Sequence, residues 1–367
     1  MGRSRWVVRI FGVVPLIAIP MFGGLGPSQG AKAAAAPAKF QVYLSNNFVG
    51  NEWRVEMQNI ARAVAGDKPF ANRIDLHIVD AATTPTAQIA SLNDIISRRP
   101  AAILLDSASP TALNATVAKA CRQGILVITY DQIANAPCAY EVGIDEFQAA
   151  AGNMRWLALT LHGKGSVAYD FGLPGAPVSI RTDAGYDAVL KQYPGIKVAS
   201  RYHGDYAPGP VAAALSNVLA SNPHISGVIC TAGCLGVVTA FQRSHLTLVP
   251  FFNYGDASAQ IIQDALTIPH MTLRMANNPT TLGGWAVEMA YNILTHAKRI
   301  APPGFVHAGG KRYNLSLLFW QNNHVHVPGS HEVQISTLKN SIKGMPLSGI
   351  YPFSLPNAPV TLKQAFG

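Results

Sequence analysis

Hydrophobic positions along the chain follow two alternating patterns, one typical of buried strands and one of amphipathic helices. Ala102–Leu105 and Ile125–Tyr130 are short apolar runs of the kind found in parallel strands that are covered on both faces. Between them lies a helical pattern, which Ser109 can cap at its start and Gly124 can end in the left-handed conformation. This stretch therefore predicts a strand–helix–strand unit with parallel strands.

Polar residues follow directly after the second of these strands. Asp131 and Gln132 come after the apolar run, where the strand is expected to reach the carboxyl edge of its sheet. Open α/β sheets bind their ligands at this edge. We therefore expect both residues at a ligand site, although Asp131 could instead cap the turn that follows it.

The same alternation of strands and helices runs from about residue 40 to residue 300. It predicts further strands at Phe40–Leu44, Ile74–Val79, Ser166–Tyr169, Ile196–Tyr202, Gly227–Cys230, Thr247–Asn253 and Met271–Met275. This number of strands exceeds what one twisted sheet usually holds. We therefore predict an α/β fold with two parallel-sheet lobes. After residue 300, Tyr313–Trp320 is predicted as one more strand, and the chain beyond Gln321 as a tail that wraps over the surface.

The amino terminus has the parts of an export signal. Arg3, Arg5 and Arg9 precede the apolar run Ile10–Phe22, and small residues around position 33 form a cleavage pattern. Two prolines interrupt the apolar run, which is too short for a good membrane span, and a retained membrane anchor is the alternative. We predict a signal peptide over residues 1–33, cleaved near residue 33, and a periplasmic mature protein.

Composition and charge narrow the choice of partners. The chain has 367 residues, of which 49% are apolar and 13% are charged, as expected for one large or two linked folded domains. Its formal net charge of +9 falls to +5 without residues 1–33, which hold four basic residues and no acidic one. The sequence has no basic block interleaved with aromatic residues, so we do not expect it to bind nucleic acid.

The chain has four cysteines, at positions 121, 138, 230 and 234. An even number in an oxidising compartment makes disulfides plausible. Cys230 and Cys234 could close a small loop, and Cys121 could reach Cys138, but the sequence leaves the connectivity open. A zinc site is less favoured, because no close pair of Cys or His residues completes it.

Sequence signatures of catalysis are absent. Beyond the predicted signal peptide, the chain contains no H-E-x-x-H, no G-x-S-x-G and no Walker A loop, and Gly172–Gly175 is too short for a dinucleotide fingerprint. We therefore expect no catalytic residue, no metal ion and no cofactor, and predict that the protein is not an enzyme.

Four stretches carry a resemblance to a known family. They are SNNFVGNEW (Ser45–Trp53), the string from Asp80 to Asp131, GLPGAPVSIRTDAGY (Gly172–Tyr186) and RMANNPTTLGGWAVEMA (Arg274–Ala290). In their order and spacing the chain resembles the type I periplasmic sugar-binding proteins of ABC importers, in particular the ribose-binding group, over roughly residues 40–300.

This resemblance implies two hinged lobes that close over one small solute, with three crossovers between them. The expected first lobe comprises residues 39–143 and 277–303, the second residues 144–276, and residues 304–367 hold the last crossover strand and the tail. It also implies delivery of the solute to an ABC permease in the inner membrane, by a binding protein that we expect to be a monomer.

Position by position, the resemblance implies a set of ligand-binding residues: Asn46, Asn47, Phe48, Asp131, Gln132, Arg181, Asn253 and Asn277. Planar polar side chains can satisfy the hydroxyl groups of a sugar, and an aromatic ring can cover its apolar face. Some of these residues also have plainer interpretations, since Asn is a common turn former and Arg181 could be a solvated helix residue. Trp53 lies on an apolar helix face and is expected in the core.

Two departures from the family pattern bear on the ligand. Gln132 stands where ribose-binding members carry an arginine, and the segment Cys230–Cys234 replaces their Asn-Asp pair. We therefore expect a neutral monosaccharide or small polyol other than ribose. The alternatives are a sugar sensor that docks a chemoreceptor or a histidine-kinase ectodomain, and an exported α/β enzyme.

Overall fold

Two seven-stranded sheets organise the chain in the computed structural model, in which we describe residues 38–81, 83–350 and 361–366. The signal peptide predicted over residues 1–33 lies outside the described residues. The first sheet has the order β11-β12-β5-β4-β3-β1-β2. Its strands are β1 (Phe40–Asn46), β2 (Ile74–Asp80), β3 (Ala102–Leu105), β4 (Leu126–Tyr130), β5 (Tyr140–Gly143), β11 (Phe305–His307) and β12 (Arg312–Leu315). All neighbours pair in parallel except β11 and β12.

The second sheet repeats this plan with the order β14-β13-β10-β9-β8-β6-β7. Its strands are β6 (Gly165–Asp170), β7 (Ile196–Tyr202), β8 (Gly227–Cys230), β9 (Phe251–Asn253), β10 (Leu273–Ala276), β13 (Phe319–Gln321) and β14 (Glu332–Gln334). Only β10 and β13 pair antiparallel. The predicted fold, two parallel-sheet α/β lobes, is confirmed.

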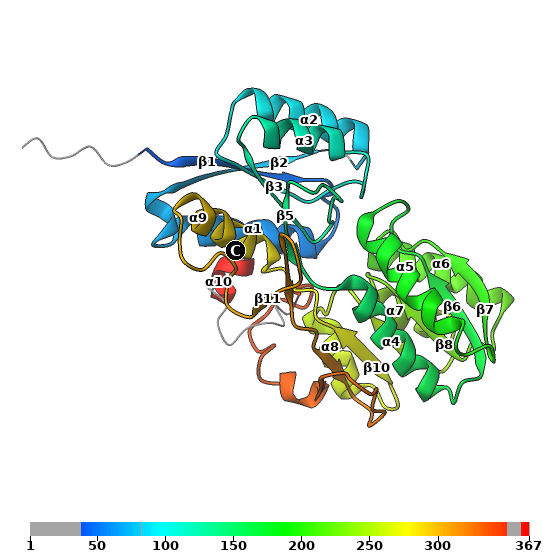
Figure 1. The fold of residues 1–367 in the computed structure, drawn as a ribbon. Coiled ribbons are helices and arrows are strands. Elements are labelled where there is room, and N and C mark those ends of the chain that lie inside the picture. Colours follow the sequence, from blue (N-terminus) through cyan, green and yellow to red (C-terminus); the bar gives the residue numbers. More distant parts are fainter. Residues whose placement is uncertain (1–37, 82, 351–360, 367) are drawn as a thin grey trace, which may run out of the picture. The chain divides into compact units, whose positions relative to one another are not determined.

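Helices cover both faces of each sheet (Figure 1). They are α1 (Glu52–Gly66), α2 (Pro85–Ser97), α3 (Asn114–Arg122), α4 (Glu146–Thr160), α5 (Pro177–Leu190), α6 (Pro208–Ser221), α7 (Leu235–Arg243), α8 (Ala259–Thr267), α9 (Leu282–Leu294) and α10 (Leu362–Phe366), with short 3-10 turns at Phe70–Asn72 and Ile335–Leu338. We call the first sheet and its helices the first lobe, and the second sheet and its helices the second lobe.

The continuous apolar runs of the strands follow from burial on both faces. In β3, Ile103 packs with α2 and α3, whereas the next residue, Leu104, packs in the core that α1 and α9 cover. Strand side chains point to alternate faces, so both faces must be apolar. The close packing of α9 on α1 requires Gly283, because a Cβ there would come within 2.6 Å of the Met57 sulfur.

The end of the chain differs from the prediction. The expected single strand Tyr313–Trp320 is two strands, β12 in the first sheet and β13 in the second, separated by residues 316–318. The chain thus passes between the sheets three times, after β5, β10 and β12. Residues beyond Gln321 do more than cover the surface, because β14 completes the edge of the second sheet.

Two other boundaries were wrong for local reasons. The helix expected after Ser109 begins only at Asn114, because the Ser109 hydroxyl accepts from the Ala112 N–H and stabilises a turn first. Strand β9 begins at Phe251 and not at Thr247. The apolar residues before it pack against the core without pairing in the sheet.

Among the described residues, no helix is both long and apolar enough to cross a membrane.

Candidate ligand-binding site

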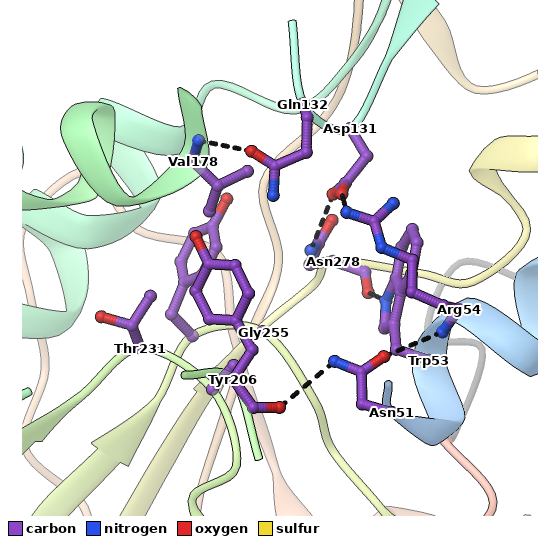
Figure 2. A pocket seen from close by; sticks show the side chains of 12 residues that line it. Asn51, Trp53, Arg54, Asp131, Gln132, Val178, Tyr206, Thr231, Gly255 and Asn278 are labelled. Carbon is purple, nitrogen blue, oxygen red and sulfur yellow. Dashed lines mark hydrogen bonds and ion pairs between the residues drawn. The ribbon is translucent and has the colours of Figure 1, made fainter. Parts of the chain in front are cut away.

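A pocket of about 340 Å³ lies where the carboxyl ends of strands from both sheets meet the starts of α1 and α5. Its walls are formed by Asn51, Trp53, Arg54, Asp131, Gln132, Val178, Tyr206, Thr231, Ala232, Tyr254, Gly255 and Asn278 (Figure 2). A ligand in this pocket would touch both lobes.

Asp131 and Gln132 line the pocket, as predicted from their place after β4. Asp131 has a positive φ of 51°, which turns the chain out of the strand and leaves the residue only 6% exposed. The Gln132 side chain crosses to the other lobe, where its Oε1 accepts a hydrogen bond of 2.9 Å from the Val178 N–H (Figure 2).

Arg54 is a pocket residue that the sequence analysis missed. It extends from the first turn of α1, is 2% exposed, and pairs with two buried carboxylates. One is Asp106, in direct contact, and the other is Asp131, at 3.1 Å. Burial raises the pKa of Asp131, and the Arg54 charge opposes that rise. The guanidinium therefore offsets part of the cost of burying this polar wall away from water.

Trp53 belongs to both the core and the pocket. It is 5% exposed and packs in the first-lobe core as expected, yet its ring also lines the cavity. Its Nε1 donates to the Asn278 carbonyl at 2.9 Å, and Asn278 Nδ2 donates to Asp131 Oδ1 at 3.2 Å. An aromatic ring, an amide and a carboxylate are thus held together by hydrogen bonds within the first lobe.

The second lobe contributes two tyrosines. The hydroxyls of Tyr206 and Ser179 lie 2.7 Å apart, so that pair is satisfied within the lobe. Tyr254 is 1% exposed, and its hydroxyl has no hydrogen-bond partner among the described residues. Burial raises the pKa of Tyr254 well above its ordinary value, so the hydroxyl stays protonated. It can therefore donate to or accept from a ligand hydroxyl.

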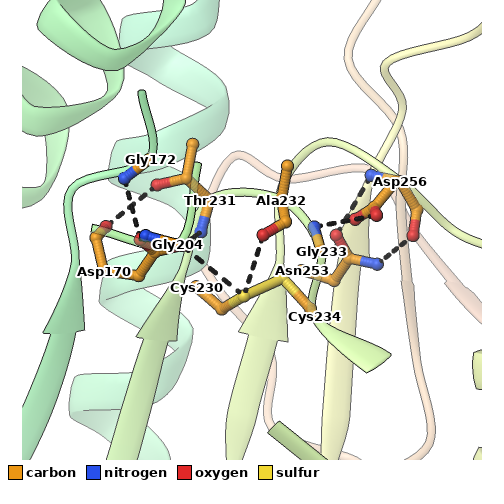
Figure 3. The surroundings of a disulfide bond; sticks show 10 residues. All are labelled: Asp170, Gly172, Gly204, Cys230, Thr231, Ala232, Gly233, Cys234, Asn253 and Asp256. Carbon is orange, nitrogen blue, oxygen red and sulfur yellow. Dashed lines mark hydrogen bonds between the residues drawn. A yellow bond between two sulfur atoms is a disulfide. The ribbon is translucent and has the colours of Figure 1, made fainter. Parts of the chain in front are cut away.

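A disulfide fixes the loop that carries Thr231 and Ala232 into the pocket (Figure 3). The bond joins Cys230, the last residue of β8, to Cys234, which precedes α7. Inside this loop Gly233 has φ 73°, and a Cβ there would lie 2.5 Å from the Ala207 backbone. The loop therefore has little freedom to move.

Asp170 reinforces the same edge of the second sheet. This buried carboxylate accepts from the N–H groups of Gly172 and Gly204, both at 2.8 Å, and of Thr231 at 3.4 Å (Figure 3). Burial raises its pKa to about 6, and the three donors oppose the rise. One side chain thus joins the loops that follow three neighbouring strands.

The structure also contains the second disulfide considered from the sequence, Cys121–Cys138.

Six of the eight predicted ligand-binding residues do not line this pocket. In the first loop, Asn46 donates to the Phe48 carbonyl and to Asp80, and Asn47 donates to the Ser107 carbonyl. The Phe48 ring lies close to Gly50, where a Cβ would come within 2.6 Å of it. These residues shape the loop, in line with the turn-forming alternative, while Asn51, Trp53 and Arg54 farther along the chain reach the cavity.

The other three have partners elsewhere. Asn253 bonds to the backbone of Asp256 at 2.5 and 3.1 Å, so the residues after it, not its own side chain, face the cavity. Asn277 holds the last crossing of the chain, donating to the Ser316 carbonyl and accepting from the Leu318 N–H. Its neighbour Asn278 is the pocket residue.

Arg181 lines a different cavity, of about 580 Å³, near the first passage between the sheets. There it pairs with the buried Glu146 at 3.1 Å. Burial raises the pKa of Glu146 to about 7, and the Arg181 charge opposes the rise.

Among the described residues, no group of three or more His, Cys, Asp or Glu side chains is placed to hold a metal ion.

Two hydrogen bonds join the lobes directly across the pocket. In one the Val178 N–H donates to Gln132, and in the other the Asn51 side chain donates to the Tyr206 carbonyl at 3.2 Å (Figure 2). Asn51 also caps α1 by accepting from the Arg54 N–H at 3.0 Å. The walls of the pocket are therefore linked to each other as well as to their own lobes.

Comparison with known proteins gives a family match over most of the chain. The model of a family described as periplasmic binding protein domain matches residues 42–298. The ribose import binding protein RbsB of Bacillus subtilis is 26% identical over 290 residues, which cover 75% of this chain and 89% of that protein. A xylitol-binding protein of Mycolicibacterium smegmatis is 28% identical over 184 residues, so the match spans only 49% of this chain and 53% of that relative.

Solved structures share the fold. A solute-binding protein of an ABC transporter from Actinobacillus succinogenes, with bound D-allose, has a TM-score of 0.66 and 21% identity. The match covers 82% of this chain and all of that one. A solute-binding protein from Burkholderia graminis, in complex with D-arabinose, has a TM-score of 0.66 and 19% identity over 77% of this chain and 96% of that one.

Proposed function

The chain belongs to the periplasmic binding protein family, and we propose that it captures a neutral monosaccharide or small polyol between its two lobes for an ABC importer. The observation that carries this proposal is the pocket itself, which takes walls from both lobes. Membership of a family of solute-binding proteins agrees with the expectation that the chain is not an enzyme.

The chemistry of the pocket supports a ligand rich in hydroxyl groups. Asp131 and Asn278 offer oxygen and nitrogen atoms from the first lobe, and Thr231 and Tyr254 offer hydroxyls from the second. The ring of Trp53 can cover an apolar ligand face. Because Arg54 is already paired with two carboxylates, the pocket has no spare cation for an anionic ligand.

Relatives support the same ligand class. The names of the matched proteins specify ribose and xylitol as their solutes, and a third relative, from Paraburkholderia graminis, is named for D-apiose. These are a pentose, a pentitol and a branched pentose, all uncharged and of similar size. We propose a ligand of this size for the present chain.

The mechanism we propose is closure of the lobes about the segments that pass between them. A ligand that contacts both lobes makes its full set of contacts only when they are closed, so binding shifts the population toward the closed form. The permease would then recognise the closed surface. We take residues 39–143 with 277–303 as the main part of the first lobe and residues 144–276 as the main part of the second, with Asp131 and Gln132 as ligand contacts on the first-lobe side.

The family consists of exported binding proteins, and we propose that the present chain is periplasmic after cleavage near residue 33. We further propose that it works as a monomer and binds no nucleic acid, in keeping with the modest charge of the mature chain.

Isothermal titration calorimetry of the purified mature protein against D-ribose, D-allose, D-arabinose, D-apiose, xylitol and a set of hexitols tests the ligand class. Sugar acids of the same carbon number serve as charged controls. We expect saturable one-to-one binding of at least one neutral compound and none of its acid. Binding of the acid alone, or of no member of the panel, would contradict the proposal.

A further inference from the structure

The carboxyl-terminal segment of the chain contacts both lobes beside the pocket. We propose that residues 346–350, which we call the C-terminal strap, tie α8 of the second lobe to Glu56 of the first and so restrict opening of the lobes. The inference concerns the lobes themselves and does not depend on which ligand the pocket binds.

On the second lobe, the strap binds the first backbone N–H groups of a helix. The first N–H groups of an α-helix have no partners within the helix. Here the N–H groups of Ala259 and Gln260, the first two residues of α8, donate to the strap carbonyls of Gly349 and Leu347 at 2.8 and 3.0 Å. Ser258 also forms an isolated β-bridge with Ile350. The strap therefore completes the cap of α8.

On the first lobe, the strap ends on a buried carboxyl group. The Ile350 N–H donates to Glu56 Oε2 at 2.9 Å, and the Thr280 hydroxyl donates to Glu56 Oε1 at 2.6 Å. Glu56 is 3% exposed and lies in α1, the helix that also carries Trp53 and Arg54 into the pocket. Burial raises the pKa of Glu56 to about 8, so a neutral side chain can fill the same place at neutral pH.

The last described helix adds a second attachment to the first lobe. The Asn59 side chain of α1 donates to the Ala365 carbonyl of α10 at 3.3 Å, and Gln364 donates to Asp67 at 3.2 Å. The Phe366 ring lies so close to Gly349 that a Cβ there would come within 2.7 Å of it. Helix α10 is thus attached both to α1 and to the strap.

The strap lies next to the ligand pocket. Ser348 and Ile350 line a cavity of about 510 Å³ together with Asn51 and Trp53, which are also pocket residues. Any motion that separates α1 from α8 must break the bonds of the strap to one of them. Each such bond is expected to shift the balance between closed and open forms about three- to tenfold.

The variant A259P tests the second-lobe end. Proline at the first position of a helix is favourable, and Ser258, with ψ 153°, already has the extended backbone that a following proline requires. The substitution therefore removes the N–H that binds Gly349 while α8 keeps its start. The matched control is A259S, which keeps that N–H.

The variant E56A tests the first-lobe end, with E56Q as its control. Glutamine can accept from Ile350 and donate to Thr280, so it preserves both contacts, whereas alanine loses them. Glu56 lies outside the pocket. If Glu56 acted only on stability, its substitution by alanine would lower the melting temperature without changing the shape of the folded protein.

The measurement is small-angle X-ray scattering of the ligand-free mature protein, with amide hydrogen exchange at Ile350. We expect A259P and E56A to have a larger radius of gyration than the wild type. E56A should also exchange the Ile350 amide at least threefold faster, because it removes the acceptor of that amide. A259S and E56Q should match the wild type in both. If A259P folds and gives the wild-type scattering curve, the strap does not restrain the lobes and the proposal is wrong. The scattering experiment uses ligand-free protein, so it tests the strap even if no compound of the sugar panel binds.

Discussion

The hydrogen bond from Val178 to Gln132 makes a sharp prediction about closure. Helix α5 begins after Ala176 at its cap position, and the alanine side chain cannot cap it. Gln132, from the end of β4, supplies the acceptor instead. When the lobes separate, water can satisfy the Val178 N–H, so the bond contributes to the closed form alone.

Substitution of Gln132 by Met removes the acceptor and keeps the length of the side chain. In the closed form the variant leaves the Val178 N–H buried without a partner, since Val178 is 5% exposed and Gln132 is 2% exposed. An unsatisfied buried donor costs about 1–3 kcal/mol. We therefore expect the dissociation constant for the ligand to rise about 5- to 150-fold, because binding requires closure.

The assay is calorimetry with the sugar or polyol that the panel identifies, joined to stopped-flow kinetics. The loss should appear mainly as faster dissociation, since the bond to Val178 exists only in the closed form. Gln132→Glu is the matched control, because its carboxylate still accepts from Val178 and a negative charge is favourable at a helix start. Wild-type affinity in Gln132→Met would refute the argument that closure depends on this bond.

Three further predictions concern stability. Arg54→Met leaves two buried carboxylates without their cation and should lower the free energy of unfolding by about 3–5 kcal/mol, measured by urea denaturation; a loss below 1 kcal/mol would contradict the buried ion pairs. The folded-state pKa of Glu56, about 8, exceeds its ordinary value of 4.5, so its contribution is complete below pH 4.5 and is lost as the pH rises through 8. The melting temperature of Glu56→Gln should therefore fall less than that of the wild type between pH 6 and 9, and equal slopes would refute the assignment. The double variant Cys230→Ser, Cys234→Ser opens a short loop and should cost about 2 kcal/mol by loop entropy. It should also weaken ligand binding because the loop lines the pocket, and unchanged affinity would show that the disulfide does not position the loop.

The fold could be predicted because burial on both faces makes a strand apolar throughout. Ile103 and Leu104 face opposite cores, so their run is continuous, and the alternation with helices then requires parallel sheets. The same signal misleads where apolar residues are buried without pairing, as before Phe251. Short strands near the end of the chain were missed because too few residues carry their pattern.

The site could be predicted only in part. Asp131 and Gln132 follow a recognisable strand, and their place at the sheet edge comes from topology alone. Arg54 could not be recognised, because a charged residue beside an apolar helix face usually lies in solvent, and its two carboxylate partners come from strands distant in sequence. Asn253 and Asn277 lie next to the pocket residues Tyr254 and Asn278. Both predictions were therefore one residue too early, and comparing loops by their spacing alone cannot resolve a difference of one residue.

A crystal structure of the mature protein, soaked with the neutral compound that binds most tightly, tests the central claim most directly. We expect one molecule of that compound between the lobes, with hydroxyl groups within 3.2 Å of Asp131 from the first lobe and of Thr231 or Tyr254 from the second. A compound bound to one lobe alone, or outside the cavity that these three residues line, would contradict it.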